Sequence, residues 1–403
     1  MEQPSKKILH SLDKYAAIGF DMDHCLVRYK IKELFPLIYK SITEVLVKER
    51  NYPEEMLEFG KKEQCYIMNG LVVDYESGYT LKLGQDKVIL RAYYGYEKVS
   101  QEDLEKRFGS PPKYEIFDPY RLHTVDYMCC LTYFNCLVTA ILAHMIEYKK
   151  KLHQENEIHI RDIVKDLSEV EIGTYLNWSA TSYTPIADFS SYYRALIEDP
   201  GRYTYKQDKL KEMLLSLKAK GKVLFIASNS HYEYLKLMME YTYGKDWVEI
   251  FDFIIPNSGK PKFFTQENPF FEIDVNTANR LGKEVKEFKR HEFYSGGNAK
   301  TLEENALRLN GNKSGRILFF GDNYSTDALA AETIEHWDAV CIMEELGDID
   351  FGEHYDDSYW GHWQYEDTPT GRVSTYWYDY MSKNVAVCTS LVDSIEMANF
   401  YEV

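Results

Sequence analysis

The period of the hydrophobic positions changes along the chain, and each period predicts a different kind of element. Residues 16–26 begin with a continuous apolar run, which is typical of a buried strand followed by a turn. Residues 32–49 place apolar side chains at helical spacing, whereas residues 66–100 alternate around glycines and predict a β-meander. The apolar stretch that follows predicts a largely helical segment over residues 119–150.

Strand and helix patterns alternate again only beyond residue 205. A helix is expected over residues 207–218, a strand over 223–227 and a second helix over 232–241. Further apolar runs predict strands at residues 253–255, 317–320 and 339–343. Such alternation is typical of a parallel sheet with helices on both faces. The sequence therefore predicts an α/β fold with a doubly wound parallel sheet and a large inserted α+β cap.

The length of the chain, 403 residues, predicts more than one structural unit, because one hydrophobic core rarely extends beyond roughly 250–300 residues. We expect residues 1–50 and 201–350 to form two parts of one catalytic core. Residues 51–200 would be inserted between them as the cap. Residues 351–403 are acidic and rich in Tyr and Trp, and we expect this extension to pack on the core.

Composition narrows the class of partner. Apolar residues make up 45% of the chain and charged residues 28%, as in ordinary globular proteins. The formal net charge of −17 argues against a nucleic-acid polymer, because such partners need a basic face. A small phosphorylated substrate is compatible with this charge, since a metal ion and one lysine can reverse the sign inside a pocket. No membrane partner is expected, and a homo-oligomer is left open.

The seven cysteines and the N-terminal residues indicate a cytoplasmic protein. The number of cysteines is odd, and they form no Cys-x-x-Cys pair, so reduced cytosolic thiols fit better than disulfides or zinc ligands. The N-terminal residues carry no apolar signal segment. Residues 127–146 lack charged side chains, but Thr132, Asn135 and His144 interrupt them, which favours a buried helix over a membrane span.

The first candidate site is the pair Asp21 and Asp23, which directly follows the first apolar run. Open α/β folds place their chemistry at the carboxyl edge of the sheet. One carboxylate there could attack a substrate or hold a metal while the other carries a proton. The alternative is a solvated acidic turn, and this pair alone does not decide between the two.

Two further candidates follow the strands predicted at 223–227 and 253–255. Ser228 and Asn229 stand at a strand-to-helix turn, where a hydroxyl group and backbone amides can hold a phosphate oxygen. The alternative is that Ser228 only caps the next helix. Lys260 could neutralise an attacking carboxylate and a phosphoryl group, or it could be an ordinary solvated lysine of a loop.

A fourth candidate, residues 321–327, directly follows the strand predicted at 317–320. Asp322 would lie at the strand end, where it could bind Mg²⁺, and Asp327 could orient metal-bound water or Lys260. Alternatively, Asp322 caps a helix whose first turn contains Asp327. Four candidates in this order, each directly after a predicted strand, favour one shared site over coincidence.

These four segments resemble, in order, the four motifs of the haloacid dehalogenase-like phosphohydrolases. Residues 70–74 and 78–83 are similar to the meander of the cytosolic purine 5′-nucleotidases and the 5′-nucleotidase domain-containing proteins. The Tyr-Ser-Gly-Gly of residues 294–297 is also similar to that family. The likeness covers residues 16–346, and His24 and the short chain favour the domain-containing group.

The resemblance implies a Mg²⁺-dependent phosphatase of nucleotide metabolism that acts on a nucleoside 5′-monophosphate. Asp21 would attack phosphorus and form an aspartyl-phosphate, and Asp23 would protonate the leaving oxygen and then activate water. Mg²⁺ would be bound by Asp21, the backbone carbonyl of Asp23, and Asp322, with Asp327 behind these ligands. The phosphate-binding residues would be Ser228, Asn229 and Lys260.

Two departures separate the chain from the purine enzyme. Cys25 stands where the first motif usually has Thr or Val, and a buried cysteine is a tolerable small apolar substitute. Residues 188–194 do not present the Arg and Asp with which that enzyme reads its base, so the base is left open. Two alternatives to a hydrolase also stay open: a catalytically weak regulatory or binding protein on the same fold, and a nucleoside phosphotransferase.

Overall fold

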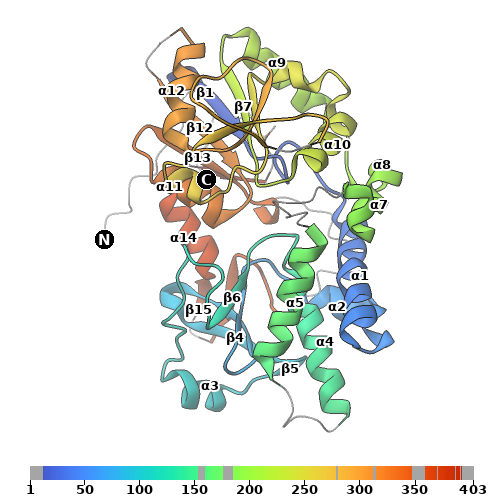
Figure 1. Ribbon diagram of the computed structural model, residues 1–403. Coiled ribbons are helices and arrows are strands. Elements are labelled where there is room, and N and C mark those ends of the chain that lie inside the picture. The colour runs from blue at the N-terminus through green and yellow to red at the C-terminus, as the bar shows by residue number, and fades with distance from the viewer. Residues whose placement is uncertain are drawn as a thin grey trace.

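The computed structural model of the chain has two lobes, one built on a large sheet and the other on a smaller antiparallel sheet (Figure 1). The second lobe is inserted after the first strand of the large sheet. A long segment of the sequence therefore separates this strand from the next strand of the same sheet. The described residues are 12–152, 159–175, 185–277, 280–311, 315–346, 359–369, 371–385, 387–390 and 392.

The large sheet combines parallel strands with an antiparallel edge. Its strands are β1 (Tyr15–Phe20), β7 (Val223–Ala227), β8 (Phe253–Ile255), β9 (Phe270–Ile273), β10 (Arg280–Val285), β11 (Glu292–Gly296), β12 (Arg316–Gly321), β13 (Trp337–Ile342) and β16 (Val387–Thr389). Their order across the described sheet is β10-β9-β11-β8-β7-β1-β12-β13-β16. The central strand β1 pairs in parallel with β7 on one side and β12 on the other. The carboxyl ends of these three strands therefore lie together at one edge.

The helices of this lobe accompany the sheet as the alternating pattern predicted. They include α9 (Asp208–Ala219), α10 (Tyr232–Tyr243), α11 (Lys262–Thr265), α12 (Ala299–Leu309) and α13 (Ala330–Glu332). Every residue of β1, β7, β8 and β13 is buried, as is usual for parallel strands covered on both faces. The mixed α/β architecture with a largely parallel sheet is thus confirmed.

The inserted lobe contains a five-stranded antiparallel sheet. Its strands are β2 (Leu71–Asp74), β3 (Thr80–Leu83), β4 (Ile89–Tyr94), β5 (Glu97–Lys98) and β6 (Tyr127–Cys130), in the order β5-β4-β3-β2-β6. The predicted meander is confirmed by the antiparallel pairs that join β2 to β5 in sequence. The prediction of a largely helical segment over 119–150 is wrong at β6, which pairs with β2. A short, fully buried apolar run has the same pattern in a strand as in a helix, which explains the error.

Several helices precede, interrupt or follow the strands of this smaller sheet along the chain. They are α1 (Ile31–Arg50), α2 (Lys61–Tyr66), α3 (Gln101–Phe108), α4 (Leu137–Lys151), α5 (Ile160–Tyr175), α6 (Ile186–Phe189), α7 (Ser191–Glu198) and α8 (Pro200–Tyr203). Helix α7 contacts both α1 and α5 at the point where the chain returns to the first lobe. Within the described ranges, no helix combines the length and the apolar character that a membrane crossing requires.

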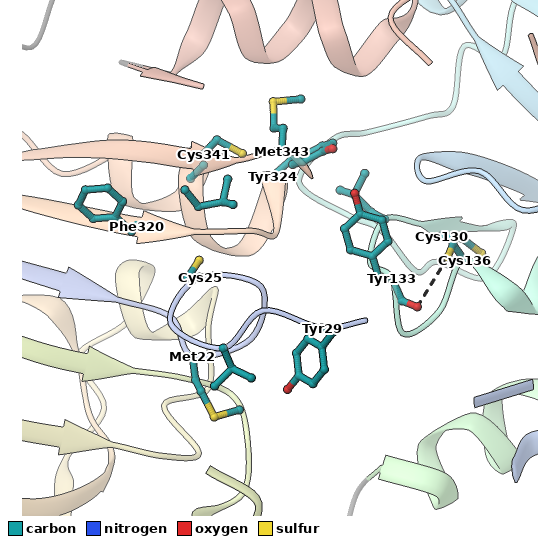
Figure 2. Packing of buried hydrophobic residues seen from close by; sticks show 14 of the residues in the cluster. Met22, Cys25, Tyr29, Cys130, Tyr133, Cys136, Phe320, Tyr324, Cys341 and Met343 are labelled. Carbon is teal, nitrogen blue, oxygen red and sulfur yellow. Dashed lines mark hydrogen bonds between the residues drawn. The ribbon is translucent and has the colours of Figure 1, made fainter. Parts of the chain in front are cut away.

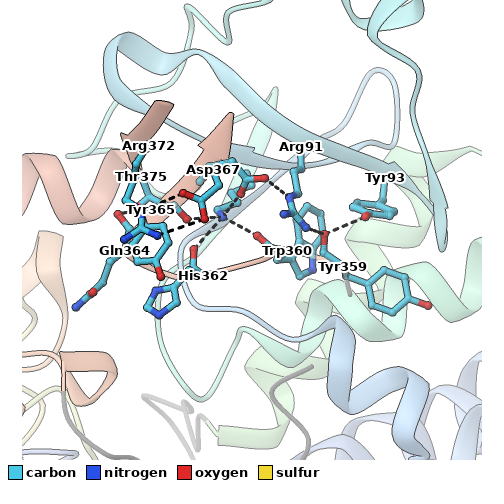
Figure 3. Close-up of polar contacts among 12 residues, drawn as sticks. Arg91, Tyr93, Tyr359, Trp360, His362, Gln364, Tyr365, Asp367, Arg372 and Thr375 are labelled. Carbon is cyan, nitrogen blue, oxygen red and sulfur yellow. Dashed lines mark hydrogen bonds and ion pairs between the residues drawn. The ribbon is translucent and has the colours of Figure 1, made fainter. Parts of the chain in front are cut away.

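The C-terminal segment contacts both lobes. It contains β14 (Tyr365–Thr368), β15 (Gly371–Ser374) and α14 (Tyr376–Asn384) before it adds β16 to the large sheet beside β13. Lys82 on β3 binds this segment to the smaller sheet. Its Nζ lies 2.7 Å from Oε2 of Glu366 and donates to the Trp360 carbonyl at 2.6 Å. Arg91 binds the other oxygen of Glu366 at 2.6 Å (Figure 3). Residues 351–358 of the expected extension lie outside the described residues.

Candidate active site

Asp21 and Asp23 lie just beyond β1, at the carboxyl edge of the large sheet. The backbone N–H of Asp21 donates to the Phe320 carbonyl of β12 at 2.7 Å, which fixes the start of the turn. Both carboxylates are buried, with relative exposures of 7% and 8%. His24 adopts φ 54°, a left-handed conformation that costs a non-glycine residue energy and is common at functional turns. The solvated acidic turn is therefore ruled out.

Lys260 binds two of the aspartates. Its Nζ lies 3.1 Å from Oδ2 of Asp21 and 2.7 Å from Oδ1 of Asp327. The side chain of Lys260 is only 1% exposed, so it is not an ordinary solvated lysine. Burial lowers the pKa of Lys260, but the charges of Asp21 and Asp327 raise the pKa more, and the ammonium form is favoured.

Asp322 and Asp327 follow β12 as the motif order predicted. The π-helical turn η6 (Tyr324–Leu329) carries Asp327 back beneath the strand end. A Cβ atom at Gly321 would lie 2.2 Å from Cβ of Asp327, so only glycine allows this approach. The helix cap is the side chain of Asn323, which accepts from two backbone N–H groups, and not Asp322.

An oxygen atom from each of Asp21, Asp322 and Asp327 lies within 4.8 Å of the other two. Burial and the neighbouring charges of Asp21 and Asp327 raise the pKa of Asp322 well above its usual value. In the described part of the chain, the ion pairs that reach these carboxylates come from Lys260. Oxygen donors with excess negative charge suit a hard divalent cation, so the residues present fit such a metal.

Ser228 and Asn229 lie at the end of β7, next to the Lys260 loop. Helix α10 begins after His231, and no side chain caps it, so Ser228 does not serve as its cap. Asn229 accepts from the Lys260 backbone N–H at 2.7 Å, and its Nδ2 donates to the Lys260 carbonyl at 3.0 Å. The Asn229 amide therefore positions Lys260, a role that the sequence did not suggest.

Asp23 is bound by two hydroxyl groups that the sequence did not single out. Tyr29 donates to Oδ1 at 2.5 Å, and Ser230 donates to Oδ2. Burial, followed by the charge of Asp21, raises the pKa of Asp23. The two neighbouring aspartates thus have different surroundings, since Asp21 contacts an ammonium and Asp23 contacts hydroxyls.

A further contact that the sequence did not predict joins His24, in the turn after β1, to Glu344. Nδ1 of the buried His24 lies 2.7 Å from Oε1 of the buried Glu344, just beyond β13. The centroid of the His24 ring lies 4.7 Å from the ring centroid of Tyr133 and 5.4 Å from that of Phe134. Figure 2 shows Tyr133 on the side of the inserted lobe, facing the turn after β1. The inserted lobe therefore reaches the turn after β1 through aromatic side chains that precede α4.

Comparisons with known proteins agree with the resemblance read from the motifs. The profile of the 5′ nucleotidase family matches residues 8–349. The chain is 30% identical over 344 residues to human 5′-nucleotidase domain-containing protein 1, a match that covers 83% of this chain and 73% of that protein. The bovine protein of the same name is 30% identical over 349 residues, covering 84% and 75%.

A more distant relative covers the same part of the chain. Human 5′-nucleotidase domain-containing protein 2 is 24% identical over 352 residues, which is 83% of this chain and 62% of that protein. The family match includes Asp21, Lys260 and Asp327, the residues that the geometry joins. The chain belongs to the 5′ nucleotidase family, and it is a phosphoric monoester hydrolase.

Proposed function

We propose that this protein is a Mg²⁺-dependent phosphatase that hydrolyses nucleoside 5′-monophosphates through an aspartyl-phosphate intermediate. The observation that carries the proposal is the contact of Lys260 with both Asp21 and Asp327, beside Asp322. An ammonium group and a cation site around one carboxylate suit an attack on phosphorus. The order of strands around β1 also supports a doubly wound core of the haloacid dehalogenase-like type.

Asp21 is the nucleophile in this proposal. Its carboxylate oxygen forms a bond to phosphorus as the bond from phosphorus to the leaving ribose oxygen breaks. A bound Mg²⁺, held by Asp21, Asp322 and the backbone carbonyl of Asp23, would supply positive charge to the phosphoryl oxygens. Lys260 supplies a second positive charge, and Asp327 keeps its ammonium group directed at the site.

Asp23 moves the protons. In its protonated form it gives a proton to the leaving oxygen, and its carboxylate then takes a proton from the water that cleaves the aspartyl-phosphate. Burial and the charge of Asp21 raise the pKa of Asp23 and so favour the protonated form. Ser228 completes the phosphate site with its hydroxyl group, and the backbone of Asn229 lies beside it.

The inserted residues 51–200 act as a cap in this proposal, and the first and last segments of the family match form the catalytic core. The aromatic contact of Tyr133 and Phe134 with His24 supports a cap that excludes water from the reaction. We also propose a cytoplasmic location, which the free cysteines of the described residues support.

The test is phosphate release from a panel of nucleoside 5′-monophosphates with Mg²⁺. We expect at least one nucleotide to be hydrolysed, and Asp21→Asn to abolish the release. Acid quenching followed by mass spectrometry should find a phosphoryl group on the peptide that contains Asp21. Parent protein no faster than the Asp21→Asn variant on every nucleotide would support the regulatory alternative. Faster nucleotide consumption on addition of a nucleoside would support the phosphotransferase alternative.

A further inference from the structure

A chain of three buried tyrosine hydroxyls ends on Asp23. Oη of Tyr29 lies 2.5 Å from Oδ1 of Asp23, and 2.7 Å from Oη of Tyr234. Oη of Tyr234 lies in turn 2.9 Å from Oη of Tyr192. All three tyrosines are buried, so these hydrogen bonds form out of contact with bulk water.

The three tyrosines come from different parts of the protein. Tyr29 follows the first motif, and Tyr234 lies on α10, directly after the turn that contains Ser228 and Ser230. Tyr192 lies on α7, at the end of the inserted segment, and its hydroxyl is linked to Asp23 through those of Tyr234 and Tyr29. The hydroxyl chain thus joins Asp23 to a helix that packs on α1 and α5.

The direction of the hydrogen bonds follows from their donors. The single O–H of Tyr29 donates to Oδ1 of Asp23, and this direction is required in the ionised carboxylate that is left after the proton is given away. Tyr234 must then donate to Tyr29, and Tyr192 must donate to Tyr234. Hydrogen bonds that run in one direction polarise each other, and this strengthens the last bond, the one to Asp23.

The two oxygens of Asp23 accept hydrogen bonds from different side chains. Tyr29 donates to Oδ1 and Ser230 donates to Oδ2, so the carboxyl group cannot rotate without losing a hydrogen bond. Each oxygen of Asp23 keeps a further lone pair, where the protonated form can carry the hydrogen that it donates to the oxygen of a leaving group. The orientation of the proton carrier is therefore set by groups that do not themselves react.

We propose that Tyr29, Tyr234 and Tyr192 are positioning residues that hold Asp23 in the orientation for protonating the leaving group. This inference rests on the proposed function, in which Asp23 gives its proton to the leaving oxygen. Tyr192 makes that orientation depend on the inserted segment, because its helix is not part of the catalytic core. The tyrosines keep their own protons throughout.

The test compares two leaving groups. A ribose 5′-oxygen is a poor leaving group and needs a proton, whereas p-nitrophenolate leaves readily without one. We expect Tyr29→Phe to lower kcat/KM for a nucleoside 5′-monophosphate by about 10- to 100-fold, the effect of one hydrogen bond to a charged group. The same variant should change kcat/KM for p-nitrophenyl phosphate by less than about threefold. Tyr192→Phe should show the same selectivity with a smaller loss, about two- to tenfold, since only a neutral hydrogen bond is removed.

The matched control is Tyr243→Phe. Tyr243 also lies on α10, and its hydroxyl donates at 2.6 Å to the Leu26 carbonyl in the same turn, but not to Asp23. This variant should leave the ratio of the two substrates unchanged. Equal losses for both substrates in Tyr29→Phe would overturn the positioning role while leaving the proposed function intact. Failure of the parent protein to hydrolyse either substrate would overturn both.

Discussion

Two clusters of charged side chains in this protein carry net charges of opposite sign. At the contact between the smaller sheet and the C-terminal segment, Lys82 and Arg91 share the carboxylate of Glu366 and also donate to backbone carbonyls (Figure 3). At the edge of the large sheet, the carboxylates of Asp21, Asp322 and Asp327 approach each other beside Lys260.

This difference in net charge distinguishes a cluster that stabilises the fold from a cluster that binds a ligand. Buried charges cost free energy unless partners satisfy them, and the Lys82 cluster finds its partners within the chain. The aspartate cluster leaves negative charge uncompensated, which favours a cation as an external partner. The bound cation together with Lys260 would then favour a phosphoryl group. Removing a charge should therefore have opposite effects on stability at the two places.

The largest effect is expected from Asp322→Asn. We expect kcat/KM to fall on the order of 10³-fold, about 4 kcal/mol of transition-state stabilisation, because a cation ligand is lost. The free energy of unfolding in the presence of EDTA should not decrease, since the substitution removes a buried negative charge. Steady-state kinetics and urea denaturation measure both quantities. The exposed Asp86 on the meander provides the control, Asp86→Asn, which should change neither; a less stable Asp322→Asn would contradict the comparison.

Lys82→Met should have the second largest effect, and on stability alone. Loss of one partner from a buried ion pair costs about 3–5 kcal/mol, and three backbone carbonyls also lose this donor. We expect the free energy of unfolding to fall by this amount, while kcat per folded molecule stays within about threefold. Lys98→Met, at an exposed position of the same sheet, is the control. A loss of catalysis without a loss of stability would show that the Lys82 cluster is functional.

Mg²⁺ should stabilise the protein through the aspartate cluster. At a concentration 100-fold above its dissociation constant, the ion should raise the free energy of unfolding by about 2.7 kcal/mol. Thermal denaturation should show an increase of Tm in the parent protein and in Lys82→Met. The same titration should leave the Tm of Asp322→Asn nearly unchanged, and an equal increase in this variant would place the cation elsewhere.

Asn229→Ala should have the smallest effect of the four. The substitution removes the two hydrogen bonds that hold the Lys260 backbone, which is worth about 1–1.5 kcal/mol, or roughly a tenfold decrease in kcat/KM. Steady-state kinetics measure this loss, and Asn384→Ala on α14 is the control. No change in kcat/KM would mean that other contacts suffice to place Lys260.

The sequence predicts the parallel strands because continuous apolar runs mark strands that are buried on both faces. The antiparallel edge was not predicted, since β10 is exposed along most of its length and has no apolar period. The pattern predicts a helix at β6, whereas pairing with β2, which lies far away in the sequence, decides its conformation. Local pattern thus predicts the centre of the sheet better than its margins.

For the candidate site, motif order predicts which residues meet, because parallel strands bring their carboxyl ends to one edge. The contact of Lys260 with Asp21 and Asp327 agrees with that reasoning. The hydroxyls of Tyr29 and Ser230 on Asp23, and the pair of His24 with Glu344, were not predicted. A tyrosine or a glutamate that contributes one atom from another element leaves no periodic or motif signal in a single sequence.

The last strand of the large sheet has a consequence for synthesis of the protein. Strand β16 pairs with β13, and the residues that precede it contact the inserted lobe, where Trp360 and Trp363 donate to the carbonyls of Tyr66 and Asn69. A ribosome releases Asp21, Asp322 and Asp327 before the residues that bridge the two lobes. During translation, the nascent chain would expose an open sheet edge at β13, and chaperones that recognise unpaired strands would find it there until the final segment arrives.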